Sequence, residues 1–148
     1  MPIHASNSSE QQQAEKIMID HIATKFNLSF DKATKLPTKT NVQPDAIDIM
    51  NKTIVEVYAR IGKLKGAQFH KVKGDILKLI FIEKELKEKW KKILCFADDA
   101  AAEYARGNSW VAEAARIFDV EILVVNLPKE QSDLVISAQK RQLMVNPK

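Results

Sequence analysis

Apolar residues recur along the chain with two spacings, which predict helices in some segments and strands in others. The apolar stripe of residues 8–26 recurs every fourth position, at Ala14, Met18, Ile22 and Phe26. Residues 67–89 have the same helical spacing, and their tail EKELKEKWKK carries the mixed charges of a solvated helix face. Both segments are therefore predicted to be amphipathic helices, the first with a cap at Ser8 or Ser9.

Four further segments have the composition of strands. Residues 42–49 and 53–60 are predicted to pair as a hairpin, because TIVEVYA in the second is rich in β-branched residues. The run KKILCFADD predicts a short strand, and VEILVVNLP predicts a buried strand that ends at Pro128. Residues 100–119, between these last two strands, are predicted to be helical and to be broken or bent near Gly107-Asn108-Ser109, and residues 129–143 are predicted to form a final helix.

This order, αββαβαβα, predicts an α/β fold with a mixed central sheet flanked by helices. The last two strands are expected to be parallel, because a helix connects them. A length of 148 residues suits one domain spanning 1–148, with residues 1–8 expected to be flexible.

Composition and charge exclude few function classes. The chain is 45% apolar and 28% charged, which is ordinary for a globular protein. No apolar run is long enough to cross a bilayer, and the polar start MPIHASNSSEQQQ lacks the apolar stretch of a secretory signal. We therefore expect a cytoplasmic protein without a membrane partner. A net charge of +4 is compatible with a polyanionic partner.

Two carboxylates carry the candidate chemistry. Asp45 begins the first hairpin strand, and Glu56 lies in the middle of the second. A two-residue turn at Asn51-Lys52 predicts that Glu56 faces Ile47 and that Tyr58 faces Asp45, with all four side chains on one side of the sheet. The two acids are then diagonal neighbours, roughly 7–8 Å apart.

A buried carboxylate pair is costly unless a cation compensates it. Mg²⁺ or Mn²⁺ fits, because such ions bind one or two carboxylates together with waters and phosphate, and they activate water against phosphodiesters. Two alternatives remain open. Asp45 could be a strand-entry turn residue after Pro44, and Glu56 could point to water from an edge strand.

The residues Pro44-Asp45, followed ten residues later by Glu56-Val57-Tyr58, resemble the signature of the PD-(D/E)xK, or restriction-endonuclease-like, nuclease superfamily. The order of elements from about residue 10 to residue 127 resembles the core of that superfamily. The resemblance implies a restriction-endonuclease-like fold.

The resemblance also implies a set of metal ligands. Asp45 and Glu56 would bind the metal, together with the backbone carbonyl of Val57. A glutamate on the first helix would face the site, and Glu15 is the first choice, ahead of Glu10.

The third motif position departs from the family pattern, because Tyr58 stands where the signature has lysine. Tyrosine is neutral near pH 7 and supplies a hydrogen bond but no charge. Either the lysine has moved or catalysis is lost. The second long helix presents four polar residues on one face, at Gln68, Lys71, Asp75 and Lys78. We expect Lys71 to be the displaced lysine and Gln68 to position water or phosphate, with Lys63 and Lys65 as substitutes.

These observations predict a metal-dependent nuclease that hydrolyses DNA, or RNA, with Mg²⁺ or Mn²⁺, and that forms a homodimer if it cuts duplexes. The alternative is an inactive module of the same fold that binds nucleic acid or a protein. A third hypothesis is a phosphate-ester enzyme that uses Asp98 at the end of a strand. For Asp98 and Asp99, helix capping is the simpler interpretation.

Overall fold

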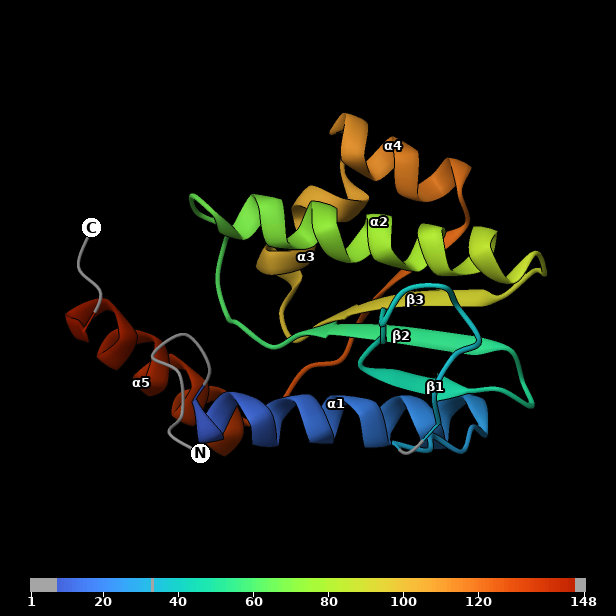
Figure 1. The fold of residues 1–148 in the computed structure, drawn as a ribbon. Coiled ribbons are helices and arrows are strands. Elements are labelled where there is room, and N and C mark those ends of the chain that lie inside the picture. The colour runs from blue at the N-terminus through green and yellow to red at the C-terminus, as the bar shows by residue number, and fades with distance from the viewer. Residues whose placement is uncertain (1–7, 33, 146–148) are drawn as a thin grey trace.

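The computed structural model describes residues 8–32 and 34–145, and shows a four-stranded sheet between two layers of helices (Figure 1). Its elements are α1 (Ser9–Phe26), β1 (Ala46–Asp48), β2 (Thr53–Tyr58), α2 (Gln68–Leu86), β3 (Lys91–Phe96), α3 (Asp99–Arg106), α4 (Trp110–Ile117), β4 (Val120–Val124) and α5 (Lys129–Val145). Helices α1 and α5 cover one face of the sheet, and α2, α3 and α4 cover the other. The predicted α/β fold is confirmed.

The strands lie in chain order in a mixed sheet. Strand β1 is antiparallel to β2, whereas β2, β3 and β4 are parallel. The parallel pairing of the last two strands is therefore confirmed. The interruption predicted near Gly107-Asn108-Ser109 is confirmed as a break between two helices, and Ser109 caps α4 by accepting from the Ala112 amide at 3.0 Å. Gly107 separates the two, and a Cβ there would lie 2.8 Å from the Glu103 carbonyl.

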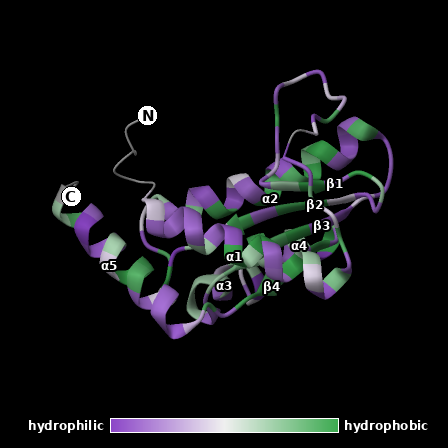
Figure 2. Cartoon of the chain, turned by 90° about the horizontal axis from the view of Figure 1, so that it is seen from below, coloured by the Kyte–Doolittle hydropathy of each residue, from purple (hydrophilic) through white to green (hydrophobic). Residues whose placement is uncertain are grey.

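Alternate residues of the strands build two cores, one on each face of the sheet. Val55 and Val57 of β2 pack against the stripe of α1 predicted from its spacing, at Ala14, Met18 and Ile22. Ile54 and Tyr58 pack on the other face against α2, at Val72, Ile76 and Leu79. Figure 2 shows the apolar colour along the strands and the polar colour on the outer helix faces.

The turn between β1 and β2 differs from the prediction. It spans Ile49 to Lys52, and the buried Asp48 holds it by accepting from the Asn51 amide and side chain at 3.0 and 2.8 Å. Ala46 therefore lies opposite Val55, and the predicted register is wrong by two residues. A shift of two residues keeps every side chain on its face, so the predicted common face of Asp45 and Glu56 survives.

Strand β1 is also shorter than the predicted segment 42–49. It begins at Ala46, directly after Pro44-Asp45. Extending the register would set Pro44 opposite Val57, where proline has no amide hydrogen to donate to the ladder. The edge of β2 beyond Val55 is therefore not covered by β1.

Two further expectations concern the N-terminal residues and the possibility of a membrane-spanning helix. The expected flexibility of residues 1–7 lies outside the described residues, whereas Ser8 is ordered as the cap of α1. Among the described helices, none combines the length and the apolar character that spanning a bilayer requires.

Candidate functional site

The two predicted carboxylates meet at the open edge of β2. Asp45 Oδ2 accepts a hydrogen bond from the Val57 amide at 2.8 Å. Extending the observed register by one residue sets Asp45 opposite Glu56, and the Asp45 carboxyl lies close enough to raise the pKa of Glu56. Asp45 is exposed, whereas Glu56 is only 1% exposed. The pair therefore joins a buried acid to one that solvent reaches.

Burial disfavours the ionised form of the Glu56 carboxyl. Burial, followed by the neighbouring Asp45 carboxyl, raises the pKa of Glu56 to about 9. Lys78 opposes this rise, because its Nζ lies 2.5 Å from Glu56 Oε1. Without a further cation Glu56 therefore keeps its proton near neutral pH. A divalent ion could replace that proton.

Groups from both helix layers surround the pair. Glu15 of α1 is partly buried, and burial together with the charge of Asp45 raises its pKa to about 7. Asp75 of α2 is 4% exposed and accepts from Lys71 Nζ at 2.6 Å. Burial lowers the pKa of Lys71, but the Asp75 hydrogen bond and the charges of Glu56 and Asp45 outweigh it and raise that pKa.

The short β1 explains how α1 and α2 can both contribute, although they cover opposite faces of the sheet. Beyond Ala46, none of the strands that the structure describes separates the layers at this edge. In an antiparallel ladder, the N–H and C=O of one residue point to the same neighbour. Since the Val57 amide points to Asp45, its carbonyl points to the same open edge. The Val57 carbonyl, predicted as the third metal ligand, therefore points toward the edge at which Asp45 lies.

The lysine whose ammonium lies beside Glu56 is Lys78, and the role of displaced lysine expected of Lys71 stays a prediction. Lys71 instead bonds Asp75, although its charge acts on both carboxylates of the pair. The sequence placed both lysines on one helix face, and the choice between them depends on which turn of α2 passes β2. Gln68 accepts from the Lys65 amide at 3.0 Å, in the turn before α2, so its observed contact is to that turn.

Tyr58 occupies the motif position of lysine within the core. It is 4% exposed and lies against Phe96, with ring centroids 5.6 Å apart. Burial raises the pKa of Tyr58 to about 12, so the side chain is neutral. Its hydroxyl is buried and makes no hydrogen bond to any other residue that the structure describes. Tyr58 can thus donate a hydrogen bond to a bound group but cannot replace the charge of lysine.

Other candidates lie apart from the pair. Glu10, the second choice on α1, forms an ion pair with Arg141 of α5 at 2.8 Å. Lys63 and Lys65 remain exposed in the turn before α2. Asp98 does not cap α3 with its side chain. It accepts from the Gly62 amide at 2.8 Å, so the capping interpretation is wrong for Asp98.

The donor set fits a magnesium-like ion. Over residues 8–32 and 34–145, no three Asp, Glu, His or Cys side chains converge closely enough to hold a metal by themselves. Mg²⁺ commonly uses only one or two carboxylates and completes its shell with water and phosphate. Asp45 and Glu56 match that number, with the Val57 carbonyl as a further oxygen, and the proton that the buried Glu56 keeps marks a position where positive charge is favourable.

Comparisons with protein-family models, with curated proteins and with solved structures return no match to this chain. The assignment of the site therefore depends on its own geometry.

The buried acids make the metal-free protein sensitive to pH. Glu56 keeps its proton in the fold up to a pKa of about 9, whereas the unfolded chain releases it near 4.5. The unfolded state thus binds fewer protons between these values, and the free energy of unfolding falls as pH rises from about 5 to about 9. Glu15 adds to the fall up to about pH 7. Urea unfolding in EDTA across this range measures the effect, and Glu56→Gln is expected to remove most of it.

Proposed function

We propose that this protein is a metal-dependent nuclease that hydrolyses phosphodiester bonds in DNA. The observation that carries the proposal is the meeting of Asp45 with the buried Glu56 at an open sheet edge, beside the ammonium of Lys78. One ammonium beside two carboxyls compensates only one negative charge, so a further cation at the pair is favourable. A divalent cation bound there would neutralise the pair, activate a water and stabilise charge on a phosphoryl oxygen.

The surrounding side chains suit this chemistry. Asp45 is fixed by the Val57 amide and Glu56 by burial, so the ligands would be held without reorganisation. Lys78 and Lys71 supply the positive charge that Tyr58 cannot, and Asp75 orients Lys71. Glu15, with a pKa of about 7, can take or give a proton near neutral pH.

The test is cleavage of plasmid and of labelled oligonucleotides with Mg²⁺ or Mn²⁺, repeated in EDTA. We expect cutting that requires the metal and that Asp45→Asn abolishes, while Asp98→Asn retains it. Asp98 is a matched control, because it is also an aspartate that accepts a backbone amide at 2.8 Å. Loss of phosphate-ester activity with Asp98→Asn but not with Asp45→Asn would support the third hypothesis instead.

An inactive module remains the second candidate, and Tyr58 at the lysine position favours it. Metal-dependent binding of DNA without any cutting by the wild-type protein would support the module. A homodimer is the expected assembly if the protein cuts both strands of a duplex, since each chain carries one site. Sedimentation with and without duplex DNA measures that state.

A further inference from the structure

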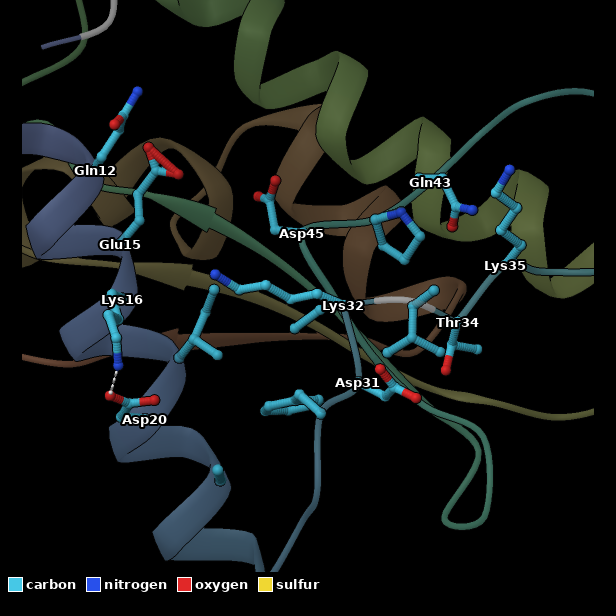
Figure 3. A pocket seen from close by; sticks show the side chains of 16 residues that line it. Gln12, Glu15, Lys16, Asp20, Asp31, Lys32, Thr34, Lys35, Gln43 and Asp45 are labelled. Carbon is cyan, nitrogen blue, oxygen red and sulfur yellow. Dashed lines mark hydrogen bonds and ion pairs between the residues drawn. The ribbon is translucent and has the colours of Figure 1, made fainter. Parts of the chain in front are cut away.

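A groove of 680 Å³ opens beside the site, between α1, residues 30–32, residues 34–35 and residues 43–47. Glu15 and Asp45 line the same groove, as Figure 3 shows, and Asp45 is one member of the carboxylate pair. Its volume lies in the range of pockets for small ligands, about 300–1,000 Å³. A segment of roughly one or two nucleotides matches this size, whereas a duplex does not enter such a space.

The groove offers cations away from its acidic end. Lys32 and Lys35 line it and are exposed, and Lys32 points across it toward α1 in Figure 3. Lys16 also lines the groove, but Asp20 pairs with it at 2.9 Å and neutralises it. Among the described residues, four acids line the groove. Asp20 pairs with Lys16, Glu15 and Asp45 lie at the end of the proposed metal site, and Asp31 is the remaining one. Lys32 and Lys35 are therefore placed to contact phosphates next to the one at the site.

The rest of the lining suits a base rather than a phosphate. Phe30, Ile19 and Pro44 contribute apolar surface. The side-chain amides of Gln12 and Gln43 lie along the same groove and are exposed. Proteins that bind single strands combine an aromatic surface for the bases with basic groups that follow the backbone. A base-paired strand cannot present its base to such a wall, because the partner strand covers it.

We infer that this groove binds unpaired nucleotides next to the scissile phosphate, so that the substrate is single-stranded DNA or a frayed end. The inference rests on the proposed function, because that function makes the Glu15 and Asp45 end of the groove the metal site. It also changes the assembly that the activity needs, since one chain suffices to cut one strand.

The test measures binding, so it does not depend on cutting. A labelled oligothymidylate of about 25 nucleotides and its duplex with oligoadenylate are titrated in Ca²⁺, with fluorescence anisotropy as the readout. We expect the wild type to prefer the single strand. Lys32→Ala with Lys35→Ala should weaken single-strand binding about tenfold or more near 0.1 M salt, and should reduce the salt slope by about 0.7 for each lost phosphate contact.

The matched control is Lys89→Ala with Lys140→Ala, which removes the same charge from exposed positions that do not line the groove. The control should bind like the wild type, and Lys32→Arg with Lys35→Arg should retain most of the affinity. Equal binding of duplex and single strand, or equal loss in the test and control variants, would overturn the inference.

The two proposals fail separately. If the wild type cuts DNA but the groove variant cuts and binds like its control, the groove assignment is wrong and the nuclease proposal stands. If the groove variant loses single-strand binding while the wild type never cuts with Mg²⁺ or Mn²⁺, the groove stands and the nuclease proposal is wrong.

Discussion

Glu56→Gln is expected to lower metal-dependent cleavage about 100- to 1,000-fold, the effect typical of removing one preorganised electrostatic group from an active site. Glutamine keeps the shape of the side chain but loses the charge that would hold a cation beside Asp45. Cleavage rates per folded protein, measured over a range of Mn²⁺ concentrations, give the effect.

The same substitution is expected to stabilise the metal-free protein near pH 9. Glutamine avoids the cost of holding a proton on a buried acid whose pKa is about 9. Lys78, which loses its partner, is 31% exposed at its side chain and can turn to water. A residue that served only the fold would show the opposite, with lower stability and unchanged cleavage.

The control for Glu56→Gln is Asp48→Asn, in the same hairpin. Asp48 is also buried, but it faces the other side of the sheet and holds the turn through Ser29 and Asn51. We expect Asp48→Asn to lower stability and to leave cleavage per folded molecule nearly unchanged. If both variants lose cleavage equally, the loss follows from damage to the hairpin and not from the site.

Glu83→Ala is expected to destabilise the fold by about 3–5 kcal/mol. Lys92 of β3 has a side chain only 1% exposed, and its Nζ lies 2.7 Å from Glu83 Oε1 of α2. Glu83 also accepts from the Trp90 amide at 2.9 Å. Truncating it leaves a buried ammonium and a backbone amide without their acceptor. For a domain of this size, the melting temperature should fall by roughly 6–20 °C.

Two variants test the cause of this loss. Glu88→Ala breaks the exposed ion pair with Lys52 and should cost less than about 1 kcal/mol. Adding Lys92→Met to Glu83→Ala should recover much of the stability, because an apolar residue replaces the uncompensated charge. A double variant no more stable than Glu83→Ala would show that the lost acceptor of Trp90, and not the buried charge, dominates.

Local sequence patterns were enough to predict most of the helices and strands, because the spacing of apolar residues follows from the repeat of each element. The spacing of Ala14, Met18 and Ile22 identified the buried face of α1, which depends only on the helical repeat. The common face of Asp45 and Glu56 was also predictable, because side chains alternate along strands. The turn was not, since the hydrogen bonds of the buried Asp48 determine its length and with it the register.

The sequence by itself determined the two apolar faces, the parallel βαβ unit and the presence of two acids on one side of a hairpin. Only the tertiary structure decided that β1 begins at Ala46, so that Glu15 and Lys71 from opposite layers reach the same edge. It also decided that Lys78 is the lysine at Glu56, and that Glu83 compensates Lys92. These contacts join residues far apart in the chain, and their distances depend on how helices pack across the sheet, which no local periodicity specifies.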